Sequence, residues 1–167
     1  AFTNTATLLA RGGAGEENGA AGTVYLEASA DGAGGGLLIV DNGGVVAQAD
    51  LYTGNRLAAE AYGTLSEIHA RARGHLLIDS DDALDGDTLL RLTDNGQVTF
   101  ETDAAVGDIV VDASAFLTLD THTLDVAVNE HHLGDPNDPN QGNTNRVDHY
   151  DQIEWTRSSG GTLFLFR

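Results

Sequence analysis

The acidic segment DSDDALDGDT has the clearest capacity for metal chemistry in this sequence. It places five aspartates around one glycine, namely Asp79, Asp81, Asp82, Asp85 and Asp87. Ca²⁺ binds six to eight oxygen ligands, and closely spaced aspartates in a glycine-containing loop can supply them. The spacing differs from that of an EF-hand, which needs glycine at position six and glutamate at position twelve. The segment is either a calcium loop or a solvated acidic corner, and the acidic corner is the preferred interpretation.

A second group of metal-ligand types lies nearer the C-terminus, in NEHHLGDPNDPN and VDHYDQ. It consists of His131, His132, Asp135, Asp138, His149 and Asp151. Zinc takes imidazole and carboxylate ligands in a tetrahedral array. Adjacent residues of a regular strand point to opposite faces, so His131 and His132 cannot both bind one ion from such a strand. Polar loop residues are the preferred interpretation, and no cofactor is predicted apart from the calcium alternative.

Catalytic motifs give little support to an enzyme. With 26 acidic residues, some pair of carboxylates always falls at a separation suited to glycoside hydrolysis, so such a pair discriminates little. Arg71 and Arg73 share one face of an expected strand near the acidic segment, but ion pairing explains them equally well. Nucleophile-elbow, P-loop and dinucleotide fingerprints are absent from the sequence. We assign no catalytic residues and predict a protein that is not an enzyme.

Aromatic side chains offer a possible surface for sugar stacking. Tyr25, Tyr52, Tyr62, Tyr150 and Trp155 are the candidates, in a chain with only 6% aromatic residues. Scattered aromatic residues more often pack into a core or a corner. Trp155 alternates with Ile153 in DQIEWTR, which favours burial of the indole.

The charge of the chain narrows its range of partners. Its 167 residues include eight basic and 26 acidic residues, for a formal charge of -18, with no cysteine and no lysine. Such a field repels phosphate backbones and anionic lipid heads, so neither nucleic acid nor membrane insertion is expected. No apolar run approaches the ~20 residues of a membrane span. The start AFTNTATLLA lacks an initiator methionine, which suggests a mature exported chain or a piece of a longer protein.

The pattern of apolar residues repeats along the chain. In LLRLTDNGQVTFETD and DIVVDASAFLTLDTH, the residues Leu90, Leu92, Val98 and Phe100 correspond to Ile109, Val111, Leu117 and Leu119. LLIVDNGGVVAQAD aligns with LRLTDNGQVTFETD, so that Val40 to Gly43 fall on Thr93 to Gly96. Recurrence at ~19 residues falls near the short end of the range for solenoid repeats.

Alternation of apolar and polar residues at period two predicts strands with one buried face. The two Asn-Gly pairs could instead close ordinary hairpins. The segment Asn55 to Arg73 fits either a helix or strands, with strands preferred. We predict an all-β fold, a right-handed parallel β-helix (β-solenoid) of roughly six to seven short coils.

One stretch resembles a known family. Gly22-Thr23-Val24-Tyr25-Leu26 and Leu38-Ile39-Val40-Asp41-Asn42-Gly43-Gly44 are similar to the G-T-[VI]-Y-L and L-[IV]-V-D-N-G-G stretches of Gly-rich parallel β-helix proteins secreted or displayed by bacteria, such as autotransporter passengers and adhesins. The resemblance covers residues ~20 to 130 and implies an extracellular or cell-surface β-solenoid of structural or adhesive function. It brings no catalytic residues. The chain is shorter than such proteins usually are.

The expected organisation has four parts. Residues 1–22 form a strand-like tail and a mobile Gly-rich loop, residues 23–133 the repeat body, residues 134–146 a polar loop, and residues 147–167 the C-terminal strands. The last of these contains four consecutive apolar residues, Leu163, Phe164, Leu165 and Phe166. A bare apolar strand is an aggregation hazard, so this one must pair with its own chain as a cap or with a neighbour.

These observations together predict an extracellular structural or adhesive module that self-associates through its terminal strands, as a filament or surface layer. Its expected partner is therefore another copy of itself. The alternative is a carbohydrate-binding or polysaccharide-cleaving β-helix, with a glycan as partner.

Overall fold

The computed structural model describes residues 10–13, 18–28, 35–48, 53–54, 65–81, 84–127 and 146–155, which are almost entirely strand and turn. The strands are β1 (Thr23–Leu26), β2 (Leu37–Asp41), β3 (Thr53–Gly54), β4 (Glu67–Arg71), β5 (His75–Ile78), β6 (Leu89–Leu92), β7 (Gln97–Phe100), β8 (Ala104–Val106), β9 (Asp108–Val111), β10 (Phe116–Thr118), β11 (Leu124–Val126), β12 (Val147–Asp148) and β13 (Ile153–Trp155). A 3-10 helix, Tyr150–Gln152, precedes β13. No helix in these ranges has the length and apolar character that crossing a membrane requires.

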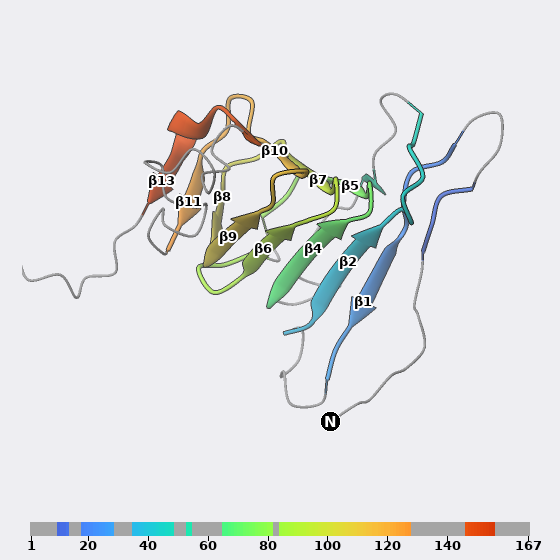
Figure 1. Ribbon diagram of the computed structural model, residues 1–167. Coiled ribbons are helices and arrows are strands. Elements are labelled where there is room, and N and C mark those ends of the chain that lie inside the picture. The colour runs from blue at the N-terminus through green and yellow to red at the C-terminus, as the bar shows by residue number, and fades with distance from the viewer. Residues whose placement is uncertain are drawn as a thin grey trace, which may run out of the picture.

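The strands form three sheets, which we call A, B and C. Sheet A has the order β1-β2-β4-β6-β9, sheet B the order β12-β10-β7-β5-β3, and sheet C the order β13-β11-β8. Figure 1 shows the strands of sheet A side by side, with β1 at one end and β9 at the other. From β2 onward, consecutive strands of the chain belong to different sheets. We call such a set of consecutive strands a row: β4 and β5 form one row, and β6, β7 and β8 form the next.

The strand register confirms the first of the two repeat alignments. β6 and β9 are parallel, with Leu90 paired with Ile109 and Leu92 with Val111. β7 and β10 are also parallel and pair Val98 with Leu117. The same apolar positions recur because each residue lies beside its counterpart in the next row.

The predicted right-handed parallel β-helix of roughly six to seven coils is wrong. The strands form small sheets of five, five and three strands, and β1 runs antiparallel to β2, which makes sheet A mixed rather than a single solenoid stack. The connection between β1 and β2 spans only residues 27–36. Antiparallel neighbours can be joined by a short connection, whereas parallel neighbours need a crossover of a dozen or more residues. Alternation in the sequence predicts strands but does not give their direction.

The second repeat alignment is wrong by one residue. Leu38 pairs with Ile68, and Ile68 pairs with Leu90, so Leu38 rather than Leu37 is the counterpart of Leu90. The alignment is wrong because it matched the two Asp-Asn-Gly tripeptides, which occupy different positions in their turns. In the first, positive φ angles fall at Gly43 and Gly44, whereas in the second they fall at Asp94 and Asn95. The second Asn-Gly joins β6 to β7, which lie in different sheets, so it does not close a hairpin.

The interior is one apolar cluster between the sheets. In sheet A, the register neighbours Leu38, Ile68, Leu90 and Ile109 are all fully buried. The cluster continues through Leu76, Ile78, Leu92, Val98, Phe100, Val106, Leu117, Leu119, Leu124 and Val126, each at most 1% exposed. Strand alternation places these residues inward and leaves the intervening polar residues outward.

The segment from Asn55 to Arg73 contains a strand where it is described. β4 alternates partly exposed Glu67, His69 and Arg71 with buried Ile68 and Ala70. This confirms the preferred interpretation for residues 67–71, while residues 55–64 lie outside the described residues.

The described residues of the Gly-rich segment, 11–13 and 18–22, form hydrogen bonds with the rest of the protein, while the mobility of this segment stays a prediction. The buried side chain of Asn42 accepts a hydrogen bond from the Gly12 N–H at 2.8 Å and donates one to the Val45 carbonyl at 2.7 Å. The Gly22 N–H donates to the Ala10 carbonyl at 2.6 Å. A buried amide needs such partners, and the glycine backbone supplies them.

Candidate functional site

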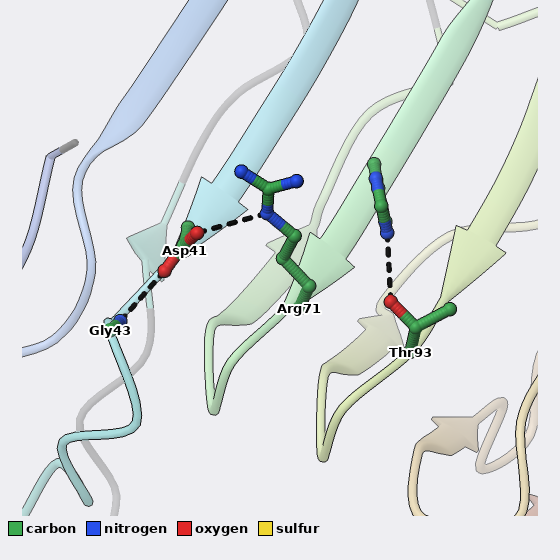
Figure 2. Close-up of polar contacts among 5 residues, drawn as sticks. Asp41, Gly43, Arg71 and Thr93 are labelled. Atoms are coloured by element: carbon green, nitrogen blue, oxygen red, sulfur yellow. Dashed lines mark hydrogen bonds and ion pairs between the residues drawn. The ribbon is translucent and has the colours of Figure 1, made fainter. Parts of the chain in front are cut away.

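The outer face of sheet A carries a set of polar contacts that joins three of its strands. Its members come from three neighbouring strands and the turn after β6: Asp41 on β2, Glu67, His69 and Arg71 on β4, Arg91 on β6, and Thr93 just beyond it. Period-two alternation turns these side chains outward while their neighbours enter the core. We call this set the outer polar cluster; Figure 2 shows part of it.

Asp41 anchors one end of the outer polar cluster. Its Oδ2 lies 2.9 Å from Nε of Arg71, and its Oδ1 accepts the Gly43 N–H at 2.7 Å (Figure 2). The Asp41 side chain is only 10% exposed, whereas that of Arg71 is 37% exposed. Charge-assisted bonds to both oxygens offset the cost of placing this carboxylate in a nearly buried position.

A second ion pair lies one strand further along. Nε of Arg91 lies 2.8 Å from Oε1 of Glu67, and both side chains are partly exposed. In the register of the sheet Glu67 faces Leu89, so this pair runs diagonally, two residues past the direct neighbour. Long side chains can span that diagonal. Exposed pairs of this kind contribute only about 0.2–1 kcal/mol each.

His69 lies between the two arginines. Arg91 is its register neighbour on β6, Arg71 is two residues along β4, and its Nε2 lies 2.8 Å from Oγ1 of Thr93. Burial lowers the pKa of the His69 imidazole, and Arg71 and Arg91 lower it further, while Glu67 and Asp41 act in the opposite direction. The imidazole therefore favours its neutral form at pH 7.

A matching contact lies across the turn on sheet B. Nε2 of His75 is 2.9 Å from Oγ1 of Thr99, and His75 faces Gln97 in the register. The histidine thus reaches two residues past its direct neighbour, as His69 does. Burial lowers the pKa of the His75 imidazole.

The contacts that the groups of the outer polar cluster already make limit the chemistry that this cluster can perform. A neutral imidazole beside two guanidinium groups can in principle accept a proton while the cations stabilise an anion. Here a carboxylate already pairs with each guanidinium, and Thr93 already bonds to the imidazole. These contacts link neighbouring strands. A ligand could bind only to the donors and acceptors that they leave unused.

Sequence reasoning identified only one member of this cluster, and it placed that member wrongly. Arg71 and Arg73 do not share a strand face, because β4 ends at Arg71 and Arg73 lies in the following turn with φ 64°. His69 belonged to no motif, and Asp41 and Thr93 entered sequence reasoning only through the repeat and the family resemblance, not as site residues. Their diagonal spacing of 24 residues between histidine and threonine becomes a signal only once the register is known.

The acidic segment is described except for Asp82 and its neighbour at position 83. Asp85 shapes a turn: its Oδ1 accepts the Asp87 N–H at 2.8 Å. The fully buried Thr88 donates from its hydroxyl to the Leu65 carbonyl at 2.7 Å. Asp79 and Asp81 are exposed beyond β5. Nowhere in the described ranges do three or more His, Cys, Asp or Glu side chains gather in a group that could hold a metal ion, so calcium binding stays a prediction.

An acidic hollow lies on sheet C, and only one residue of its lining, Asp81, belongs to a sequence-predicted site. Asp81, Asp103, Ala104, Ala105, Thr123, Asp125 and Glu154 line a volume of about 340 Å³. Asp125 pairs in register with Ala105 on one side and Glu154 on the other. The small side chain of Ala105 leaves the space. Asp103 is engaged with its neighbours, because its Oδ1 accepts the Thr123 N–H at 2.8 Å.

The remaining predicted residues fall into three groups. Tyr25, Tyr150 and Trp155 pack against the core, and the rings of Tyr150 and Trp155 lie 6.4 Å apart. Trp155 is partly rather than fully buried, so the prediction of its burial is confirmed only in part. His149 lies 3.7 Å from Asp148, and Asp151 is exposed in the 3-10 helix. Tyr52, Tyr62, His131, His132, Asp135 and Asp138 lie outside the described residues.

The predicted assembly residues, Leu163, Phe164, Leu165 and Phe166, also lie outside the described residues, so their pairing stays a prediction. The sheets reach position 155, at the end of β13. Comparisons with models of protein families, with curated proteins and with solved structures gave no match.

Proposed function

We propose that this protein is an extracellular structural or adhesive module that associates with copies of itself through strand addition. The observation that carries the proposal is the position of β13, which is the outermost described strand of sheet C and is separated from Leu163 by seven residues. Seven residues span up to about 25 Å. The apolar segment can therefore reach a sheet edge of its own chain or that of a neighbour.

Strand addition suits this end of the molecule. A sheet edge presents a row of backbone donors and acceptors that an extended segment can pair with. β13 is parallel to β11 and places Ile153 inward, next to the core. An added strand with alternating apolar residues would continue that buried face.

The outer polar cluster supports a structural role. Its ion pairs and hydrogen bonds join β2 to β4 and β4 to β6, so most of its bonding capacity strengthens the body of the protein. A repeating assembly needs a stable body with two complementary ends, because head-to-tail contacts that do not close give open filaments.

Size measurement tests the proposal. Light scattering on the intact chain should give oligomers, and deletion of residues 162–167 should give monomers with unchanged circular dichroism. Because a charge of -18 opposes association, the oligomer fraction should rise with salt. A Phe164→Asp variant is a milder version, and Arg167→Gln is the control that leaves the apolar segment intact. A monomeric intact chain, or a deletion variant that assembles unchanged, would refute the proposal.

A second candidate function is carbohydrate binding or polysaccharide cleavage, favoured by the position of His69 between Arg71 and Arg91. Glycan-array binding by the intact chain that is lost in Arg91→Ala, while the protein stays folded, would support this candidate. Equal binding by both proteins would argue against a role for the outer polar cluster.

A further inference from the structure

Two histidines of one row bond to two threonines of the next in the same geometry. His69 on β4 reaches Thr93, and His75 on β5 reaches Thr99, at 2.8 and 2.9 Å. In each case the threonine lies two residues beyond the direct register neighbour of the histidine. The two contacts flank the turn at Ala72 and Arg73, so they join the rows on both sides of one corner.

The surroundings of His69 oppose a positive charge. Along β4 it is flanked by Glu67 and Arg71, β6 contributes Arg91 as register neighbour, and β2 contributes Asp41. Both carboxylates already pair with arginines. A protonated His69 would therefore be a third cation placed between two guanidinium groups.

His75 is disfavoured as a cation by a different means. Its described contacts on β7, the register neighbour Gln97 and the diagonal partner Thr99, are uncharged. The described residues of β3, Thr53 and Gly54, pair with Leu76 and Leu77. The nearest charged residue along the chain is Arg73, in the turn. Loss of water around the half-buried ring is the dominant effect on this imidazole.

We propose that His69 and His75 form an acid-sensitive seam between the row of β4 and β5 and the row of β6 and β7. At neutral pH both rings are uncharged and hold the rows together through Thr93 and Thr99. In acid both rings gain a proton in positions that disfavour it, and the two rows separate more readily.

The direction of the pH dependence follows from linkage. Burial lowers the pKa of both imidazoles in the folded protein, and an unfolded histidine has a pKa of about 6.5. The unfolded chain therefore binds protons first as the pH falls. The contribution of the two rings is fully present above about pH 6.5 and is lost progressively below it.

Thermal unfolding of the intact chain across this range tests the seam. The variants are His69→Gln, His75→Gln and the double variant, because glutamine can still bond to threonine but does not titrate. Between about pH 7.5 and pH 5 the wild-type Tm should fall relative to that of the double variant, with each single variant in between. The difference between the two curves cancels the titration of the carboxylates common to both proteins.

A second readout locates the effect. Hydrogen exchange of the wild type, corrected for intrinsic rates, should speed up in acid at β6 and β7 before it does at β11. The control is the double variant Thr93→Ser and Thr99→Ser, which keeps both hydroxyls and should keep the acid-induced fall in Tm. Parallel Tm curves for the wild type and the glutamine variants, or acid-induced exchange that spares β6 and β7, would overturn the proposal.

Discussion

Replacement of Gly96 by alanine should strongly destabilise the protein for a purely steric reason. A Cβ at this position would lie 2.1 Å from the carbonyl oxygen of Ala70 and 2.4 Å from its carbon. Both atoms belong to the backbone of the neighbouring row, so no side-chain rotation can relieve the contact. Only separation of the rows by more than an ångström would make room.

The size of the effect follows from the bonds that such a separation breaks. The same Ala70 carbonyl accepts the Thr93 N–H at 3.0 Å, and the Gly96 carbonyl accepts the Phe116 N–H at 3.0 Å. Each lost hydrogen bond costs about 1 kcal/mol. Crowding in a packed region adds about 1–3 kcal/mol. Gly96→Ala should therefore lower the free energy of unfolding by about 3–5 kcal/mol.

Gly86 provides the matched control, because a Cβ there would meet nothing within 4 Å. Gly86→Ala should change stability little, or raise it by a few tenths of a kcal/mol by restricting the unfolded chain. Urea unfolding followed by circular dichroism and by the fluorescence of Trp155 measures both variants. A cost below about 1 kcal/mol for Gly96→Ala would refute the close stacking of the rows at this turn.

Two further predictions concern the core and the turn after β9. Leu90 is fully buried and Val46 is 57% exposed, so Leu90→Ala should cost about 2–5 kcal/mol in urea unfolding and Val46→Ala less than about 0.5 kcal/mol. Equal costs would contradict the assignment of the core. Asp112→Asn should cost about 1 kcal/mol at pH 7, because Asp112 accepts the N–H groups of Asp94, Ser114 and Ala115. Burial acts to raise the pKa of Asp112, but these bonds and the Ser114 hydroxyl lower it overall, so the difference from wild type should shrink below about pH 3.9; a constant difference would contradict this.

The sequence predicted the strands well because burial follows period two. In β4, β5 and β6 every second residue is buried, and the alternating letters show this directly. The 19-residue repeat also predicted correct neighbours for Leu90 and Leu92. Direction was not predictable in the same way. Nothing in the alternation of Thr23 to Leu26 distinguishes an antiparallel partner from a parallel one, and the short connection to β2 decides it.

The residue types in the turns were the least reliable basis for predicting the register of the strands. Asp-Asn-Gly occurs at residues 41–43 and 94–96, yet Asp41 ends a strand and is nearly buried, whereas Asp94 lies in a turn with φ 49°. Glycine after the first tripeptide explains the difference. Gly43 and Gly44 both take the left-handed conformation at no steric cost, and this moves the turn by one residue. A one-residue shift reverses the faces of a strand, so the alignment matched the buried Leu90 with Leu37 in place of Leu38.

The candidate site was hidden from the sequence for a related reason. Its members are joined across rows, directly between Asp41 and Arg71 and diagonally between His69 and Thr93, and the sequence spacing of both contacts depends on the length of each turn. Asp41, His69 and Thr93 come from three successive rows, so an error of one residue at any turn separates them in an alignment. Residue types that can bind metals are easier to find in the sequence, but here they are a poor guide to a site. Aspartate is common in this chain, and Asp85 stabilises the turn in which it lies.

Within the outer polar cluster, the arginines are the residues that can both link neighbouring strands and bind a ligand. Arg71 and Arg91 each contact a carboxylate through Nε, which fixes the plane of the guanidinium group while more than a third of the side chain stays exposed. A guanidinium group carries five donors, so a second acceptor can bind at its terminal amino groups without breaking the first contact. Nε2 of His69 already contacts Thr93. To exchange a proton with a substrate, this nitrogen would first have to give up its hydrogen bond to Thr93. A binding role for this face is therefore compatible with its structural role, whereas a catalytic role for His69 through Nε2 would weaken the seam that holds β4 to β6.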